Sequence, residues 1–443
     1  MTQVRPPHVL YVAWGFPPSR TGGVHRALAT VNAFAADGWR VTVLTVPRQV
    51  FHHVTGADDA LEALVDPRAQ VLRIPFEWPA RSSDLRSWPA RRVLFPRLWA
   101  TVRKRLDLRA FPEVGYGPWR HELEAAARRV HAEHPVDLVV ATTNPEVSVT
   151  AAVRLHDDAG VPYVVDYRDA WTLHTYSGAR RHAADSPVGV WEARSLAGAA
   201  EIWLVNEPLR RWHAAAYPPL AERMHVVMNG YDRDLPDTLV RVPDPAGPLR
   251  FGYLGTMTHV VPLAEFVAGW RRGRQVWPEV AAGRAELRGY LGYYGTPDAG
   301  LTAIVDAAAD AAVSYSGPVS KTEVAATYAD FDVLLFLLGG GEYVTSGKVF
   351  EYMSTGLPIV SVLTPGCAAA EVLAGYPRRH QAADLSPDAI AGALAEAADD
   401  ARAADGPARA AAAREHARQF RRDRQLGPRL EALRALVEAR VTA

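Results

Sequence analysis

The chain has 443 residues, 49% of them hydrophobic and 22% charged, which leaves room for two or three folded domains and excludes a disordered protein. Because 49 Lys and Arg balance 49 Asp and Glu, nucleic acid is not expected as a partner. With Cys367 as its single cysteine, the chain can form neither an intramolecular disulfide nor a cysteine metal cluster. The sequence shows no signal-peptide order and no apolar run near the ~20 residues that span a bilayer. We therefore expect a cytoplasmic protein.

The first half of the chain alternates short apolar runs with segments of helical apolar spacing, which predicts a parallel α/β sheet. The predicted strands are 8–14, 41–46, 137–141, 163–166, 202–205 and 225–228. The predicted helices are 24–37, 121–133 and 146–158. Together these elements predict a first Rossmann-like domain over residues 1–232.

Residues 73–119 interrupt this alternation. Among many arginines and prolines they carry four tryptophans, Trp78, Trp88, Trp99 and Trp119. One helical stretch is predicted near 98–108. The favoured interpretation is an irregular insertion whose tryptophans pack on the first domain. Because interleaved Arg and Trp also suit interfaces, an acceptor-binding or membrane-surface element is the alternative.

A Pro- and Asp-rich segment, 232–248, predicts a linker, after which the alternation starts again. The predicted strands are 249–254, 285–291, 313–316, 333–338 and 358–362, and the predicted helices are 264–275 and 321–329. They predict a second domain over 249–415. Residues 407–441 are rich in Arg, Ala and Leu, with a break expected at Gly427-Pro428. A C-terminal helix over 416–443 is expected to cross back to the first domain.

The most informative segment is 339–360, where a glycine-rich turn follows an apolar strand and leads into a short helix. Lys348 and Glu351 lie three residues apart in that helix and therefore share a face. N–H groups at a helix start and an ammonium suit a diphosphate, and the carboxylate suits ribose hydroxyls. Thr345 or Ser346 is the expected N-cap. The alternative is a capped helix with a Lys–Glu surface ion pair.

A second glycine-rich loop, which contains Gly22 and Gly23, lies between the first strand and the first helix. Ligands of parallel sheets bind beyond the carboxyl ends of the strands, so this loop is a candidate phosphate site. His25 and Arg26, in the first turn of the helix, are placed to reach the same ligand. The alternative is a tight strand-to-helix turn.

The third candidate is the end of the predicted strand 163–166, where Asp166, Arg168 and Asp169 follow one another closely. Two carboxylates and a guanidinium at this edge of a sheet indicate catalytic groups. The alternative is a structural ion pair between Arg168 and one aspartate.

Taken in chain order, five stretches resemble the GT-B fold glycosyltransferases, specifically the retaining enzymes of glycosyltransferase family 4. The Gly22-Gly23 loop looks like the N-terminal glycine loop of that family. D-Y-R-D-A-W at 166–171 is similar to the D-F-R-D-P-W signature of one bacterial branch, and V-M-N-G-Y-D at 227–232 to its P-N-G-[FY]-D. F-G-Y-L-G-T at 251–256 looks like the start of the donor domain, and S-G-K-V-F-E-Y at 346–352 resembles the S-x-K-x-x-E-Y donor motif. The resemblance spans nearly the whole chain.

The resemblance implies two Rossmann-like, doubly wound parallel-sheet domains that face a cleft, and transfer of a sugar with retention. The donor is a nucleoside-diphosphate sugar, with UDP slightly favoured, and neither a metal nor another cofactor is needed. The implied donor-binding residues are Gly22, Gly23, Gly255, Thr256, Ser346, Gly347, Lys348 and Glu351, and the implied catalytic residues are Asp166, Arg168 and Asp169. Glu351 would hold the ribose, and the Gly22-Gly23 amides would contact phosphate across the cleft. The acceptor is a hydroxyl of a small molecule or of a glycan or lipid-linked intermediate, and peripheral contact with the inner face of the membrane stays open.

Three departures from the family pattern matter. Glu342 and Glu351 are one residue further apart than the usual E-x₇-E, so Glu342 is the weaker candidate. The Arg and Lys that usually clamp the diphosphate are missing from 255–260, and Lys348, Arg288 or an arginine of the first domain is expected to compensate. Arg168 stands where many members have histidine. These departures keep open a nucleotide-sugar epimerase or hydrolase, or a non-catalytic partner subunit that binds a sugar nucleotide. The base, the sugar, the acceptor and the oligomeric state stay open.

Overall fold

The computed structural model describes residues 5–78, 85–232, 244, 247–292, 297–320 and 323–442, which form two α/β units. The first unit comprises Met1–His174, Ala179–Val227 and Leu426–Ala443, and the second comprises Thr175–Gly178 and Met228–Gln425. Most of the predicted linker 232–248 lies outside the described residues. So do residues 79–84 of the predicted insertion and the start of the predicted helix 321–329.

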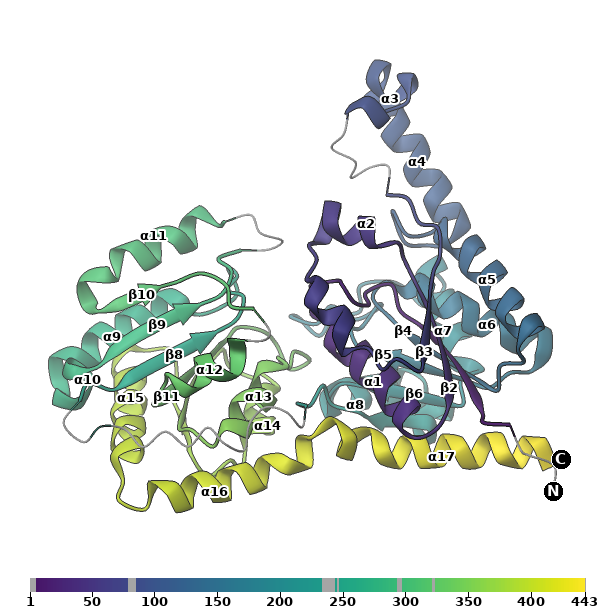
Figure 1. The fold of residues 1–443 in the computed structure, drawn as a ribbon. Helices are drawn as coiled ribbons and strands as arrows, with labels where there is room; N and C mark the ends of the chain where they lie inside the picture. Colours follow the sequence, from purple (N-terminus) through teal and green to yellow (C-terminus); the bar gives the residue numbers. More distant parts are fainter. Residues whose placement is uncertain are drawn as a thin grey trace. The chain divides into compact units, whose positions relative to one another are not determined.

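The first unit is built on a seven-stranded parallel sheet with the order β3-β2-β1-β4-β5-β6-β7 (Figure 1). Its strands are β1 His8–Val12, β2 Arg40–Thr45, β3 Ala69–Arg73, β4 Leu138–Thr142, β5 Tyr163–Tyr167, β6 Glu201–Leu204 and β7 Met224–Val226. The strand order reverses between β1 and β4. In open α/β sheets ligands bind at this switch point, beyond the carboxyl ends of the strands.

Helices cover both faces of this sheet, which explains why β1 is buried along its whole length. They are α1 Val24–Ala36, α2 Arg48–Val50, α5 Trp119–Glu133, α6 Val149–Ala159, α7 Pro187–Ala197 and α8 Glu207–Ala216. Val9 and Tyr11 of β1 pack with Val31 and Phe34 of α1 in one core. Successive strand residues point to opposite faces, so the equally buried Leu10 faces the other helical layer.

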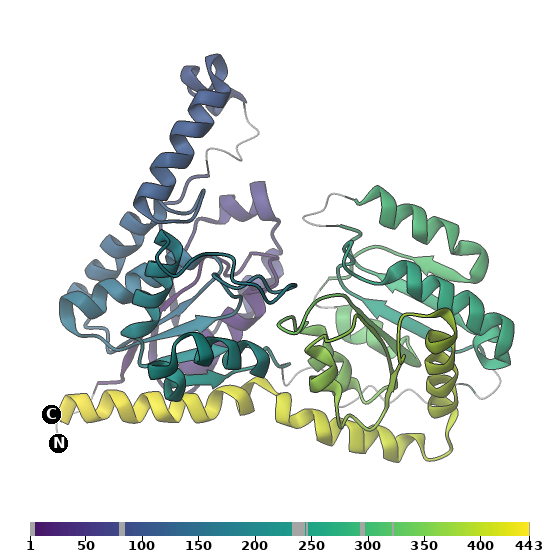
Figure 2. The ribbon, with the colours of Figure 1, turned by 180° about the vertical axis from the view of Figure 1, so that it is seen from behind.

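The C-terminal helix α17, Arg422–Thr442, completes the core of the first unit (Figure 2). The break expected at Gly427-Pro428 does not occur, because the helix runs on with Pro428 inside it. An interior proline typically costs about 3 kcal/mol, and burial of four apolar side chains offsets this cost. These four are Leu426, Leu430, Leu433 and Val437. The chain leaves the helical path earlier, at Arg421, whose ψ is 139°.

The second unit repeats the plan with six parallel strands in the order β10-β9-β8-β11-β12-β13. The strands are β8 Arg250–Leu254, β9 Arg284–Arg288, β10 Val313–Tyr315, β11 Val333–Leu338, β12 Ile359–Leu363 and β13 Arg379–Gln381. One core lies between the sheet and α9 Leu263–Val276, α10 Pro278–Ala282, α11 Ala299–Ala307 and α15 Pro387–Arg402. The other holds α12 Val324–Ala329, α13 Lys348–Thr355, α14 Ala369–Leu373 and α16 Gly406–Ala417. The two parallel-sheet, Rossmann-like units confirm the predicted α/β fold class.

Two tryptophans of the predicted insertion pack into an aromatic cluster of the first unit. The ring centroids of Trp14 and Trp78 are 5.8 Å apart, and those of Phe76 and Trp119 are also 5.8 Å apart. Tyr116 joins the same cluster through Trp78, at 4.8 Å. This part of the insertion therefore packs on the domain, as the favoured interpretation expected.

The other part of the insertion is helical and carries the remaining two tryptophans. It forms α3, Ala90–Leu94, and α4, Pro96–Ala110. Arg92 lies 3.6 Å from the ring centroid of Trp88 and 4.9 Å from that of Trp99, so these rings pack on a guanidinium. Figure 1 shows α3 at the end of α4 that points away from the seven-stranded sheet.

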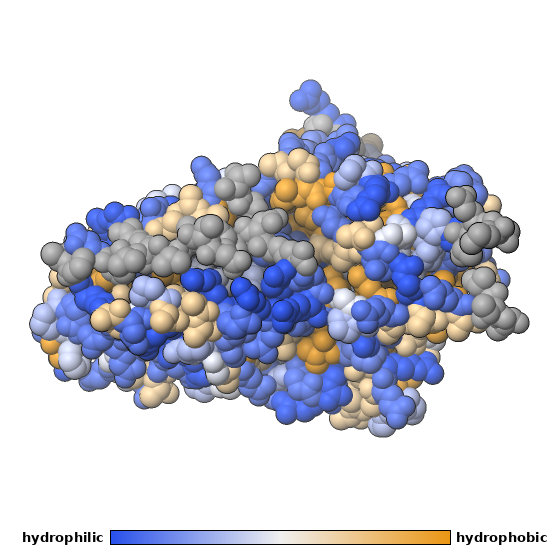
Figure 3. Space-filling view, turned by 60° about the horizontal axis from the view of Figure 1, so that its bottom comes forward, coloured by the Kyte–Doolittle hydropathy of each residue, from blue (hydrophilic) through white to orange (hydrophobic). Residues whose placement is uncertain are grey.

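None of the helices in the described parts of the chain is both long and apolar enough to cross a bilayer. On the face drawn in Figure 3, hydrophilic side chains cover most of the surface, with smaller apolar areas among them.

Truncation of one α17 side chain tests the contribution of this helix to the first core. Leu433 is fully buried, so Leu433→Ala should lower the free energy of unfolding by about 2–5 kcal/mol. Glu431→Ala, at an exposed position of the same helix, should stay within about 0.5 kcal/mol. Urea unfolding followed by tryptophan fluorescence measures this, since all 12 tryptophans except Trp270 and Trp277 belong to the first unit. Equal midpoints for the two variants would contradict the role of α17 in this core.

Candidate functional site

A buried ion pair joins the first turn of α1 to the end of β5. The side chain of Asp166 is fully buried and that of Arg26 is 6% exposed. Arg26 donates from Nη2 to Oδ1 over 2.6 Å and from Nε to Oδ2 over 3.0 Å, and its Nη1 donates to the carbonyl of Val227 over 2.7 Å. Both carboxylate oxygens are thus used inside the unit. The ion pair between Arg168 and one aspartate, foreseen as an alternative, exists with Asp169, whereas Asp166 pairs with Arg26.

The glycine loop before α1 lies against Arg168. Gly23 is the N-cap of α1, and a Cβ atom placed on it would be 2.1 Å from Nη1 of Arg168. A Cβ atom on Gly22 would meet no atom within 4 Å. Glycine at position 23 therefore leaves the space in which the guanidinium lies over the loop, whereas position 22 faces open space. His25, half-buried in the first turn of α1, follows directly.

Arg168 and Asp169 form a second pair that is open to solvent. Arg168 Nη2 lies 2.7 Å from Asp169 Oδ2, and the side chain of Asp169 is 51% exposed. Asn144 donates to the same carboxylate oxygen over 2.6 Å from the loop after β4, the neighbouring strand. Burial raises the pKa of Asp169, but the charge of Arg168 and the hydrogen bond from Asn144 outweigh this and leave it below its ordinary value. Asp169 is therefore an ionised and accessible carboxylate at the carboxyl edge of the sheet.

Sequence reasoning missed two acidic residues beside this pair. Glu146, in the loop after β4, is only 6% exposed; burial raises its pKa, and the nearby charges of Glu113 and Glu192 raise it further. Burial also raises the pKa of Glu113 to about 7, although its Oε2 accepts a hydrogen bond from the backbone N–H of Val147 over 3.0 Å. Near neutral pH, Glu146 and Glu113 therefore favour the protonated form, whereas Asp169 at the same edge of the sheet is ionised.

The signals for these two acids differ. Glu146 is the first residue of the predicted helix 146–158, and its position beyond the carboxyl end of the predicted strand 137–141 could have identified it. Glu113 lies in the insertion, 34 residues before Val147, whose backbone N–H donates to it. Nothing in the local sequence pattern links these two residues.

In the second unit, Lys348 and the loop after β8 form one contact network. Lys348 Nζ donates to Tyr253 Oη over 2.6 Å, and this hydroxyl donates to the carbonyl of Thr256 over 3.0 Å. A Cβ atom on Gly255 would lie 2.5 Å from Nζ, and the φ of this residue is +140°. The loop therefore needs glycine at this position, both for its backbone conformation and for the approach of the ammonium.

The helix that carries Lys348 begins one residue later than predicted. Gly347 is the N-cap of α13 and provides no side-chain cap, in place of the expected Thr345 or Ser346. Ser346 Oγ accepts a long hydrogen bond of 3.4 Å from the backbone N–H of Lys348. Lys348 is thus the first helical residue, where the helix dipole adds to its positive charge.

Glu351, one turn further along α13, is held by a buried tyrosine. Tyr328, which is 1% exposed, donates to Glu351 Oε2 over 3.1 Å. The next residue, Tyr352, accepts at Oη from the N–H of Leu254 over 2.8 Å and donates to its carbonyl over 3.2 Å. These contacts fix α13 against the end of β8, so the structure brings Gly255, Lys348 and Glu351 together.

The two lower-ranked candidates of the second unit lie elsewhere. Glu342 is exposed in the loop before α13. Arg288, at the end of β9, donates to Glu286 over 2.8 Å and lies 3.6 Å from Asp330. With these carboxylates beside it, Arg288 is a weaker candidate than Lys348 for a phosphate contact. In the described ranges, no three or more His, Cys, Asp and Glu side chains gather in a way that could hold a metal ion.

Residues 21–230 match the family model of the glycosyl transferase 4-like domain. The matched segment contains the Gly22-Gly23 loop, the Arg26–Asp166 pair and the Arg168–Asp169 pair. No curated protein is significantly similar to the chain in sequence.

Solved structures of similar fold cover almost the whole chain. A glycosyltransferase from Rickettsia africae aligns with 98% of this chain and 99% of its own, at a TM-score of 0.67 and 11% identity. Anabaena HepE in complex with UDP and glucose aligns with 97% of this chain and 100% of its own, at a TM-score of 0.60 and 14% identity. A putative UDP-N-acetylglucosamine 2-epimerase from Listeria monocytogenes aligns with 98% of this chain and 97% of its own, at a TM-score of 0.56 and 11% identity. At these identities the similarity shows the GT-B fold, which transferases and epimerases share.

The pKa of Glu113 predicts how stability depends on pH. The pKa of Glu113 is about 7 in the folded state and 4.5 in the unfolded chain. Below pH 4.5 the carboxyl group is protonated in both states, so it does not lower the free energy of unfolding. Between the two values the unfolded chain releases the proton and the folded chain keeps it, so stability falls as the pH rises, and the full cost applies above pH 7. Glu113→Gln, which stays neutral, should therefore be more stable than wild type by about 1–3 kcal/mol at pH 8, and much less so at pH 5.

Thermal unfolding at pH 5 and pH 8 measures this difference. Glu122→Gln, which alters an exposed carboxylate on α5, is the matched control and should follow the wild-type pH profile. A Glu113→Gln advantage of equal size at both pH values would show that burial of the charge is not its cause.

Proposed function

We propose that this protein is a glycosyltransferase that moves a sugar from a nucleoside-diphosphate sugar to an acceptor hydroxyl, with retention of configuration and without a metal. The observation that carries the proposal is the arrangement of Gly255, Lys348 and Glu351 around α13. It combines a glycine loop, a cation at a helix start and a carboxylate one turn inside. The match of residues 21–230 to the glycosyl transferase 4-like domain supports it independently.

The second unit binds the donor in this proposal. The carboxylate of Glu351 accepts hydrogen bonds from the ribose hydroxyls, and Tyr328 keeps it oriented. The start of α13, with Gly347 and Lys348, faces the diphosphate, because helix dipole and ammonium are both positive there. Ser346 and Thr256 flank this position. UDP is the favoured nucleotide, and the similar HepE structure holds UDP and glucose.

The first unit binds the acceptor, with the exposed carboxylate of Asp169 accepting a hydrogen bond from the reacting hydroxyl. Arg168 and Asn144 orient this carboxylate and keep it ionised. During transfer the bond between the anomeric carbon and the diphosphate oxygen breaks, and the acceptor oxygen bonds to the same face of that carbon. Its proton passes to the departing diphosphate, whose negative charge Lys348 stabilises. Asp166 takes no part in these steps, because Arg26 occupies it fully.

Glu351→Ala should weaken nucleotide binding at least tenfold, since about 1.4 kcal/mol or more depends on charged hydrogen bonds to ribose. Tyr328→Phe, which removes the hydroxyl that holds Glu351, should give a smaller loss in the same direction. Isothermal titration calorimetry with UDP measures both variants. Glu396→Ala, a change at a side chain that is 71% exposed on α15, is the control and should bind like wild type. Wild-type affinity in Glu351→Ala would overturn the donor site.

Asp169→Asn should lower turnover more than donor binding. The amide keeps the shape of the side chain but carries no charge and cannot accept as a carboxylate does. The test measures kcat with a working acceptor and, separately, the Kd of the donor. A thermal-shift screen of UDP, GDP, dTDP and ADP sugars selects the donor beforehand. Equal losses in kcat and in donor affinity would contradict a role at the reacting hydroxyl.

A specific observation favours a second candidate, a nucleotide-sugar epimerase or hydrolase. Residues 255–260 contain no Arg or Lys where the family has its diphosphate clamp, and Arg288 is engaged by carboxylates. Turnover of a UDP-sugar in the absence of any acceptor would favour this candidate over a transferase. Binding of the donor without turnover under any condition would instead indicate a non-catalytic partner subunit.

A further inference from the structure

The exposed apolar side chains of this protein are concentrated on α3, α4 and the residues just before them. Of the 15 large hydrophobic side chains that are exposed in the described parts of the chain, eight lie between residues 85 and 108. Six of them form what we call the α3–α4 stripe: Val93, Leu94, Phe95, Leu98, Val102 and Leu106. Such a concentration is informative, because large contiguous apolar patches on soluble proteins commonly mark interaction sites. A partner surface is therefore expected for the stripe.

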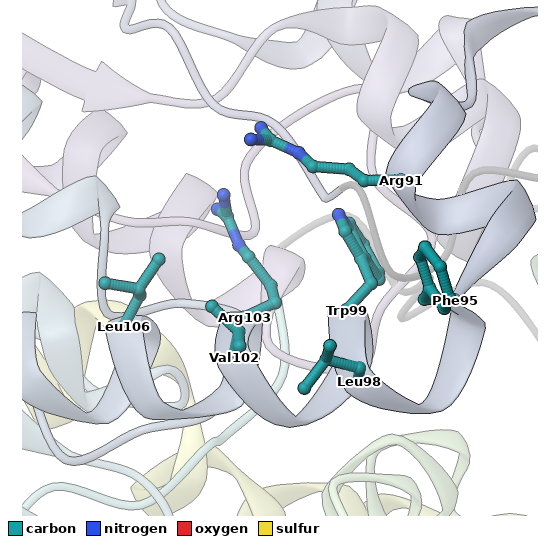
Figure 4. Close-up of a pocket in the computed structure, with 7 residues that line it drawn as sticks. All are labelled: Arg91, Phe95, Leu98, Trp99, Val102, Arg103 and Leu106. Atoms are coloured by element: carbon teal, nitrogen blue, oxygen red, sulfur yellow. The ribbon is translucent and has the colours of Figure 1, made fainter.

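The stripe is continuous along α4. Leu98, Val102 and Leu106 follow at four-residue intervals and so share one face of the helix, and Phe95 is the residue just before α4. Their exposed fractions are 62%, 46%, 55% and 61%, in that order. Together with Arg91, Trp99 and Arg103 they line a cavity of about 250 Å³ (Figure 4).

Positive charge surrounds the stripe. Residues 85–110 contain eight basic side chains against one acidic side chain, whereas the whole chain is neutral. The basic side chains are Arg86, Arg91, Arg92, Arg97, Arg103, Lys104, Arg105 and Arg109. The single carboxylate, Asp107, is buried and lies 3.0 Å from Arg103. The occupant of this surface must therefore combine apolar groups with negative charge.

The charge argues against a second copy of the chain as the occupant. Two stripes packed on each other would bring both sets of arginines together, with no exposed carboxylate from this segment to compensate. The surface of a bilayer with anionic lipids meets both requirements, since phosphates lie directly above acyl chains.

The helix pair is also prepared for an interface of this kind. Arg92 packs on the rings of Trp88 and Trp99 and so holds α3 on α4. Tryptophan rings and arginines of an amphipathic helix commonly lie at the level of the lipid headgroups. Figures 1 and 2 show that α3 and the adjoining turns of α4 extend away from the seven-stranded sheet. The sheet of the first unit therefore does not keep a flat surface from contacting them.

We propose that α3 and α4 dock the protein on a membrane surface that carries anionic phospholipids. The stripe inserts between the headgroups, and the surrounding arginines and Lys104 bind the lipid phosphates. The proposal uses no residue of the donor or acceptor sites. It therefore holds or fails independently of the transferase activity.

The test is co-sedimentation of the full-length protein with vesicles. One set contains phosphatidylcholine and phosphatidylglycerol, and the other contains phosphatidylcholine alone. Wild type should bind the anionic vesicles at least tenfold more tightly, and added salt should weaken this binding. The double variant Leu98→Glu/Val102→Glu should lose at least tenfold in affinity, because it places two carboxylates in the stripe.

The matched control is Val190→Glu/Val276→Glu, which adds the same charge at exposed valines on α7 and α9 and should bind like wild type. Both double variants should unfold at the wild-type temperature, since the four replaced side chains are all exposed. Equal binding of both vesicle types, no binding by wild type, or equal losses in the two double variants would overturn the proposal. So would sedimentation velocity that shows a dimer in wild type and a monomer in Leu98→Glu/Val102→Glu, because the stripe would then bind a second copy.

Discussion

The polar edge of the first unit depends on one buried charge. Asp166 has no exposed surface, and an ionised carboxylate in such a place needs a cation and filled hydrogen-bond sites. Arg26 supplies both, and through the carbonyl of Val227 it also fixes the chain just after β7. The first turn of α1 therefore has one position relative to β5. That position places Gly23 under Arg168, and Arg168 beside the ionised Asp169, so a buried ion pair determines the geometry of an accessible one.

In the second unit, Lys348 and Glu351 are hydrogen-bonded to the hydroxyl groups of tyrosines. Three tyrosines, Tyr253, Tyr328 and Tyr352, contact Lys348, Glu351 and the end of β8 respectively. Burial raises the pKa of Tyr328 and of Tyr352, so their hydroxyls keep their protons at neutral pH. The tyrosine hydroxyls orient the ammonium of Lys348 and the carboxylate of Glu351.

The sequence allowed most of the sheets to be predicted, because apolar runs such as β1 and β11 are buried on both faces. Strands β3 and β13 were missed, since both lie at sheet edges and β13 has the polar sequence Arg379–Gln381. The strand–turn–helix pattern correctly predicted a helix that carries Lys348 and Glu351. The partners of these side chains were not predictable, because Tyr253 and Lys348 are 95 residues apart in the chain. Buried carboxyl groups were missed for the same reason, as their environment comes from distant segments.

The first core is assembled from both ends of the chain. Its sheet is encoded before residue 228, but part of its apolar cover comes from α17, which follows the second unit in the chain. During synthesis the apolar face that awaits Leu430 and Leu433 stays uncovered until the second unit has emerged. The first unit therefore cannot reach its final packing before the segment that forms the second unit has been synthesised.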